Sequence, residues 1–260
     1  MSSGILQVSS DFWNFRGSYK VAGVLDVGTQ TSLVQLASGA FVFLDSYTLD
    51  AAARRKVDEL TDGGEAIEAI LNLHPFHTLH VQKMHEMYPG ATLYGTARHL
   101  ERFPDLPWAE VRTEDPELHQ HYAEDFDFSV PRGVDFISRN DSLHFSSVLA
   151  LHRASKTIHS DDTLMYVRLP LLMSWMSVNN AVSFHPTLAK VLERRAGAVQ
   201  DFRDWATELI ERWRDTQNLC AAHTAALLAS ENHGDSIHTR LLQALEKIEP
   251  VLAAHEKKYG

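Results

Sequence analysis

Alternation of apolar and polar side chains in the first part of the chain predicts strands joined by tight turns. Residues 32–36 alternate between the two kinds, and residues 40–44 are a nearly continuous apolar run. The segment between them, Ala37-Ser38-Gly39, has the composition of a tight turn. We therefore expect a β-hairpin whose second strand is buried and is closed by Asp45.

The next segments follow the order helix, strand, helix, strand. Residues 49–60 have helical spacing of apolar positions, and residues 66–71 form a short apolar run typical of a strand. A second helical pattern covers residues 80–88, and residues 91–95 follow as a strand. A β-α-β unit of this kind predicts neighbouring strands in a layered α/β fold.

The remainder of the chain is predicted to contain an irregular segment, then strands, and then helices. Residues 101–131 are rich in acidic, proline and aromatic residues, so we expect an irregular insertion there. Strands are predicted over residues 134–137, 148–151 and 157–159, and helices over residues 188–213 and 237–254. Because no repeat or low-complexity linker is visible, we expect one domain over residues 1–260, with a helical C-terminal part.

Charge and apolar content narrow the classes of function. The formal net charge is −10, which argues against non-specific binding to nucleic acid or to an anionic membrane. The longest apolar stretch contains Pro170 and is too short to span a bilayer, and the first residues lack the pattern of a signal peptide. Cys220 is the only cysteine, so no internal disulfide forms. We expect a cytoplasmic protein with a small-molecule substrate; its oligomeric state is left open, a homo-oligomer included.

The strongest chemical signal is a histidine cluster directly after the predicted strand at 66–71. His74, His77 and His80 recur at every third residue in the sequence Asn-Leu-His-Pro-Phe-His-Thr-Leu-His. Neutral imidazole is the commonest protein ligand for metal ions. Histidines in a turn that follows a strand are well placed to converge on one ion. The alternative is a polar turn packed with neutral, hydrogen-bonded imidazoles.

The order of these elements, and the residues at their ends, resemble the metallo-β-lactamase superfamily from about Val21 to about Thr224. The hairpin that ends at Asp45 is similar to an early segment of that family. The resemblance implies an α/β fold of four layers, an αββα sandwich, with a metal site along one edge of the paired sheets.

The family's main motif, H-x-H-x-D-H, is only half present. Counting back from Tyr88-Pro89-Gly90, which resembles the end of the family's next helix, places Asn72 at the first His position and His74 at the second. Phe76 then stands at the Asp position and His77 at the last His position. Asn72 could coordinate weakly through its carbonyl oxygen, whereas a phenyl ring cannot coordinate at all.

Three later positions resemble the remaining ligands of the family. His144 precedes a turn of small residues and a strand, and Asp162 follows a strand in the place of the family's bridging Asp. His223 comes after a helix and a short strand, as the family's last His does. For Asp162 the plainer alternative is a cap or turn residue at a strand end. For His144 and His223 it is a histidine without a ligand role.

The resemblance implies that His74, His77, His144, Asp162 and His223 are the metal ligands, with Asp162 also the catalytic carboxylate. Zinc accepts this set of nitrogen and oxygen donors, and iron or manganese is also compatible with it. Because Phe76 replaces a charged ligand, we expect one ion rather than two. His80 is a candidate substitute ligand, and His159 is a candidate to hold a ligand in place.

Three functions remain open from the sequence. The first is a metal-dependent hydrolase in which metal-activated water attacks an ester, thioester, lactone or amide. The second is a non-catalytic binding protein that kept the fold and lost the dinuclear site, as Asn72 and Phe76 suggest. The third is an iron-dependent, non-hydrolytic enzyme. Substrate specificity is expected to reside in the loops at 101–131 and 164–186, and their sequences do not indicate a particular substrate.

Overall fold

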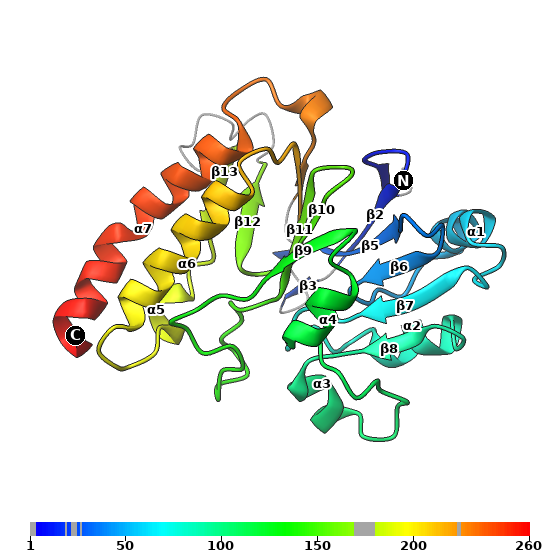
Figure 1. Ribbon diagram of the computed structural model, residues 1–260, viewed down its shortest axis with the longest axis horizontal. Coiled ribbons are helices and arrows are strands. Elements are labelled where there is room, and N and C mark those ends of the chain that lie inside the picture. Colours follow the sequence, from blue (N-terminus) through cyan, green and yellow to red (C-terminus); the bar gives the residue numbers. More distant parts are fainter. Residues whose placement is uncertain (1–3, 19, 22–24, 27, 169–179, 223–224) are drawn as a thin grey trace. The chain divides into compact units, whose positions relative to one another are not determined.

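The computed structural model describes residues 4–18, 20–21, 25–26, 28–168, 180–222 and 225–260. The chain divides into two compact units, drawn together in Figure 1. Unit 1 comprises residues 1–127 and 152–155, and unit 2 comprises residues 128–151 and 156–260. Each unit is built around a β-sheet with its own apolar core.

The sheet of unit 1 has six strands in the order β1-β2-β5-β6-β7-β8. Neighbours from β1 to β6 pair antiparallel, whereas β6 with β7 and β7 with β8 pair parallel. The strands are β1 (Ile5–Gln7), β2 (Phe12–Gly17), β5 (Thr29–Gln35), β6 (Phe41–Leu44), β7 (Ile67–Leu71) and β8 (Thr92–Tyr94). Strands β3 (Lys20–Val21) and β4 (Leu25–Asp26) form a separate two-stranded ribbon. The parallel strands end together after Leu71 and Tyr94, where the histidine turn begins.

Helices α1 (Ala51–Leu60) and α2 (Val81–Met87) pack on this sheet. Asp50 caps α1, because its carboxylate accepts the N–H groups of Ala52 and Ala53. Val57 of α1 and Met84 of α2 are fully buried against the apolar side chains of the sheet. Two short helices, α3 (Ala97–Arg102) and α4 (Pro116–His121), follow β8.

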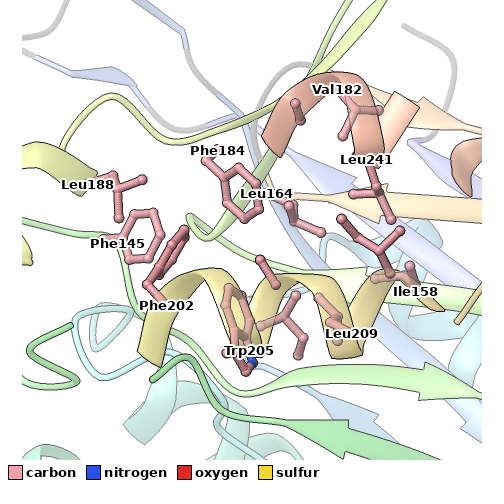
Figure 2. Packing of buried hydrophobic residues seen from close by; sticks show 14 of the residues in the cluster. Phe145, Ile158, Leu164, Val182, Phe184, Leu188, Phe202, Trp205, Leu209 and Leu241 are labelled. Carbon is pink, nitrogen blue, oxygen red and sulfur yellow. The ribbon is translucent and has the colours of Figure 1, made fainter. Parts of the chain in front are cut away.

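Unit 2 contains a five-stranded sheet of order β15-β14-β11-β10-β9 and a two-stranded ribbon of β12 and β13. Its strands are β9 (Phe126–Ser129), β10 (Leu149–His152), β11 (Thr157–Ser160), β12 (Leu164–Val167), β13 (Ala181–Phe184), β14 (Asn218–Ala221) and β15 (Ala226–Leu227). Its helices are α5 (Leu188–Val191), α6 (Ala198–Arg212), the 3-10 helix η2 (Ala229–Glu231) and α7 (Ile237–Tyr259). Figure 2 shows Phe202, Trp205 and Leu209 of α6 packed with Phe145, Phe184 and Leu241 in the core of this unit.

Most of the elements predicted from hydrophobic periodicity are present. The hairpin of β5 and β6, the β7-α2-β8 unit and the helix at the C-terminus are confirmed. The predicted helix over 188–213 is wrong as one element, since Leu192 takes an extended conformation (φ −54°, ψ 128°) that ends α5, and α6 begins only after Gly197, which is left-handed (φ 81°). The predicted strand at 134–137 is also wrong, because only Val134 forms a bridge, with Leu192. Residues 101–131, expected to be irregular, contain α4 and the whole of β9 among turns.

Among the described helices, none combines the length and the apolar composition needed to cross a membrane.

Candidate metal-binding site

In unit 1, Asp45 organises the turn that carries the histidines. Asp45 follows β6 in a left-handed backbone conformation (φ 62°), which aspartate tolerates better than most residues. Its carboxylate is 2% exposed and accepts the N–H of Leu73 at 2.8 Å and that of His74 at 3.4 Å. A charged acceptor on two consecutive buried amides fixes where the chain leaves β7.

Asn72, at the position where the family resemblance expects the first histidine, is part of the scaffold. Its side-chain oxygen accepts the Ser46 hydroxyl at 2.7 Å, and its amide nitrogen donates to the Tyr94 carbonyl at 2.9 Å. The backbone carbonyl of Asn72 accepts the Thr113 hydroxyl at 2.9 Å. The side chain therefore joins β6, β7 and β8, and coordination through its oxygen would compete with the Ser46 bond.

His74 and His77 lie together, as the spacing predicts. Their rings are stacked with centroids 4.0 Å apart, and His74 is fully buried. The Nδ1 atom of His74 accepts the Phe76 N–H at 3.1 Å, so this nitrogen carries no proton. This bond occupies the Nδ1 lone pair, so coordination by His74 would compete with the Phe76 N–H, either directly at Nδ1 or through a change of tautomer that frees Nε2. The two imidazoles are thus close enough to act as neighbouring donors.

Phe76 stands where the resemblance expects an aspartate. Its ring contacts the His74 ring edge-on, with centroids 6.1 Å apart, and the Arg98 guanidinium lies 4.5 Å from its centroid. This cation–π contact places a positive charge beside the histidine pair in place of a carboxylate. The local charge is therefore less favourable for a second metal ion than in a motif that keeps the aspartate.

Next to this turn, His99 of α3 is a fully buried histidine in a fixed tautomer. Its Nδ1 accepts the backbone N–H of Thr96 at 3.1 Å, so a neutral ring carries its proton on Nε2. Burial lowers the pKa of His99 to about 4, because the charged form loses its solvation, and the charge of Asp45 offsets this only in part. His99 is neutral at physiological pH and belongs to the scaffold under the turn.

His80 is bonded within unit 1 on one side of its ring. Its Nδ1 lies 2.9 Å from the Thr48 hydroxyl, and its ring meets the Tyr47 ring edge-on at 5.1 Å. Burial and the neighbouring His77 lower the pKa of His80. A ligand role would have to use Nε2, so His80 is a weaker candidate for a metal ligand than His74 and His77.

In unit 2, His144 and Asp162 approach each other, as the resemblance implies. Nδ1 of His144 lies 3.8 Å from Oδ2 of Asp162, and the Asp162 side chain is only 2% exposed. Nε2 of His144 lies 2.7 Å from the Asp141 carbonyl, which can only accept a hydrogen bond. The proton of a neutral His144 therefore resides on Nε2, and the lone pair of Nδ1 faces the carboxylate side.

Hydroxyl groups hold the turn that carries Asp162. Thr163 donates its hydroxyl to the Phe145 carbonyl at 2.8 Å and accepts the Ser147 N–H at 3.1 Å. The Ser160 hydroxyl accepts the N–H of Leu164 at 3.3 Å. These bonds tie the segments 145–147 and 160–164 together, which is why His144 and Asp162, distant in sequence, lie close together.

Two further buried ligand candidates in unit 2 are His159 and Asp161, and in unit 1 Asp45 is a third. The pattern of residues alone predicts only a supporting role for His159 and no ligand role for Asp45 or Asp161. Asp45 could have been recognised as a carboxylate at the end of a buried strand. Asp161 could have been recognised as the first of two acidic residues that follow another buried strand. His223 lies outside the described residues, so its ligand role stays a prediction.

Comparison with solved structures identifies the fold. A metallo-β-lactamase from Erythrobacter litoralis, solved with β-mercaptoethanol in its active site, matches with a TM-score of 0.59 at 13% identity over 94% of this chain and 96% of its own. TMB-1 matches with a TM-score of 0.57 at 10% identity over 94% and 97%. The metallo-β-lactamase FIM-1 from Pseudomonas aeruginosa, in its mono-zinc form, matches with a TM-score of 0.55 at 11% identity over 95% and 96%.

Searches against family models and against curated proteins gave no match. At these identities the structural likeness establishes the fold alone. The predicted α/β fold with the architecture of metallo-β-lactamases is confirmed, over about 94% of the chain. The buried His and Asp residues are compatible with metal binding.

Proposed function

We propose that the protein is a metal-dependent hydrolase whose ligands for one metal ion are His74, His77, His144 and Asp162. The observation that carries the proposal is that each unit presents a pair of such groups. His74 and His77 are stacked, and His144 faces a buried carboxylate. The Nδ1 of His144 is unprotonated, because its Nε2 donates to the Asp141 carbonyl. Three nitrogen donors and one oxygen donor suit zinc, as well as iron or manganese.

A bound ion of this kind would lower the pKa of a coordinated water and supply hydroxide near neutral pH. The protein's own part is to hold the ligands and to receive a proton. Asp162, buried and beside His144, is placed to orient that water and to take part in proton transfer. An ester, thioester, lactone or amide is the proposed substrate class, with His223 as a further ligand.

Zinc is the first choice of metal, because a related fold has been solved in a mono-zinc form. A single ion is expected, since Phe76 supplies no ligand and Asn72 is bonded to Ser46 and Tyr94. Asp45, His159 and Asp161 are proposed as the alternative donors if a second ion binds.

The test is hydrolysis of p-nitrophenyl acetate, a thioester, a lactone and nitrocefin by the purified protein. Activity should disappear with a chelator, return with zinc, and be lost in His74→Ala and Asp162→Ala. His121→Ala is the control, because that side chain is 61% exposed and belongs to neither pair. A protein that stays metal-free after growth with zinc, iron and manganese, and gains no thermal stability from them, would refute the proposal.

A second candidate is a non-catalytic binding protein, and the contact between Phe76 and Arg98 favours it. The two candidates differ in whether the metal-loaded wild type is active, and Phe76→Asp, which restores the missing carboxylate, tests the effect of the absent ligand. If the wild-type chain is an active mono-metal enzyme, this change raises metal content and leaves the existing activity measurable. If the wild-type chain is inactive with metal bound, the binding protein is the better description.

A further inference from the structure

A groove of about 660 Å³ lies in unit 2, and its lining includes Leu143, the residue before His144, but none of the candidate metal ligands. It runs between α5, the segment that follows α5, and the C-terminal half of α7, which Figure 1 shows at the red end of the chain. Clefts that bind small molecules have volumes of about 300–1,000 Å³. The groove is therefore large enough for a ligand the size of a lipid-derived molecule.

The floor of the groove is apolar. Pro250, Val251 and Ala254 contribute one face of α7, and Leu192 contributes from the segment after α5. Val251 is 37% exposed, whereas the next residue, Leu252, is fully buried in the core of the unit. Helix α7 thus has two apolar faces, one covered by its own unit and one open to the groove.

Three cations border this apolar floor, namely Lys190, Arg194 and Lys258. Arg194 and Lys258 both lie near Tyr259, at one end of the groove. Their charges therefore lower the pKa of Tyr259, and Lys258 has the stronger influence. The Lys258 ammonium is 4.9 Å from the centroid of the Tyr259 ring. Within the described parts of the chain, none of the three cations has a carboxylate at ion-pair distance.

The acidic side chains near the groove are engaged elsewhere. Glu249 and Glu256 of α7 both pair with Arg203. Glu193, between Leu192 and Arg194, pairs with Arg195. The side chains that line the groove and carry a permanent charge are therefore all cationic, although the chain as a whole has a net charge of −10.

We propose that this groove binds an anionic amphiphile, namely a hydrocarbon chain that ends in a carboxylate. The hydrocarbon would cover Pro250, Val251 and Ala254, and the carboxylate would lie between Arg194 and Lys258. A purely apolar ligand would leave the two cations without a counter-charge, and a small inorganic anion would leave the floor exposed to water. The proposal does not depend on the hydrolase proposed above.

The experiment is calorimetric titration of the full chain with decanoate, decanol and decyltrimethylammonium, which share a tail and differ in the head. Decanoate should bind at least about tenfold more tightly than either other probe, since only its head pairs with the cations. Equal binding of the three, or no binding of decanoate up to its solubility, would overturn the proposal. Tighter binding of poly-glutamate or of phosphatidylglycerol vesicles than of decanoate would also overturn it, in favour of an acidic partner or a membrane surface.

Matched variants locate the site. Arg194→Glu and Lys258→Glu should each weaken decanoate binding at least about fivefold, because each replaces an attractive charge with a repulsive one. Val251→Asp should weaken it as well, by placing a charge on the apolar floor. Lys257→Glu is the control, because Lys257 lies on the same helix, is exposed and does not line the groove. Loss of binding in this control equal to that in Lys258→Glu would show a general charge effect and contradict the site.

Discussion

The candidate ligands of unit 1 and those of unit 2 are held in different ways. In unit 1, His74 is fully buried, and the chain around it is fixed by Asp45 and Asn72 through bonds to backbone and side chains. In unit 2, the His144 side chain is 39% exposed, and its Nε2 meets a single backbone carbonyl. The turn in unit 1 is part of the fold itself, whereas His144 can change without disturbing the core. Mutations should therefore separate stability from metal binding.

The largest effect on stability is expected at Asp45. Asp45→Ala should lower the free energy of unfolding by about 3 kcal/mol, because it leaves the buried amides of Leu73 and His74 without their acceptor. Asp45→Asn keeps an oxygen and tolerates the left-handed backbone, so it should cost about 1 kcal/mol. Urea unfolding measures both. Equal losses in the two variants would mean that the hydrogen bonds of Asp45 do not hold the turn.

His99 should make the stability of the protein depend on pH. In the unfolded chain its pKa is near 6.5, and burial lowers it to about 4 in the folded chain. As the pH falls through this range, the unfolded chain takes up a proton that the folded chain does not. The contribution of His99 to the free energy of unfolding is therefore fully present above pH 6.5 and is lost towards pH 4. The contribution is up to about 3 kcal/mol.

His99→Gln removes the titrating group and should flatten this part of the profile of unfolding free energy against pH. His121→Gln, at a surface histidine, is the matched control and should leave the profile unchanged. An unchanged slope between pH 6.5 and pH 4 in His99→Gln would show that His99 does not titrate as its burial requires.

Asn72→His tests whether the scaffold role excludes the family's first ligand. The change breaks the bonds to the Ser46 hydroxyl and the Tyr94 carbonyl, so it should cost about 2 kcal/mol in urea unfolding. Metal content measured by mass spectrometry should not rise. A variant that keeps its stability and gains a metal equivalent would show that Asn72 occupies a ligand position after all.

His144→Ala should have the smallest effect on stability and a clear effect on metal binding. Because the side chain is partly exposed and its Nε2 bonds to a backbone carbonyl rather than to the core, the cost in unfolding free energy should be within about 0.5 kcal/mol. Zinc affinity, measured by competition with a chromogenic chelator, should fall at least about tenfold. A loss of stability similar to that of Asp45→Ala would remove the contrast between the two units.

The fold was predictable where periodicity is strong and local. The hairpin before Asp45 and the long C-terminal helix follow from alternation and from a helical stripe. The interruption at Gly197 was not predictable in this way, since glycine within a helical pattern only weakens it, and tertiary packing decides whether the chain turns there. Strand β2 was also missed, although its Trp13 and Phe15 belong to the core of unit 1.

The candidate site was predictable only in part. The pairing of His74 with His77 follows from spacing within one turn. The pairing of His144 with Asp162 was inferred from a resemblance, because no local pattern indicates which distant segments meet. The scaffold roles of Asn72 and Asp45 depend on hydrogen bonds between strands, which a single sequence does not reveal.

The central claim is that His74, His77, His144 and Asp162 are ligands of one metal ion. Its most direct test is the metal content of the purified chain, measured by mass spectrometry for the wild type, for His74→Ala in unit 1 and for Asp162→Ala in unit 2, with His121→Ala as the control. We predict about one equivalent of metal in the wild type and in the control, and loss of most of it in each of the two other variants. A wild type without metal, or full metal retention when the ligand of either unit is removed, would contradict the claim.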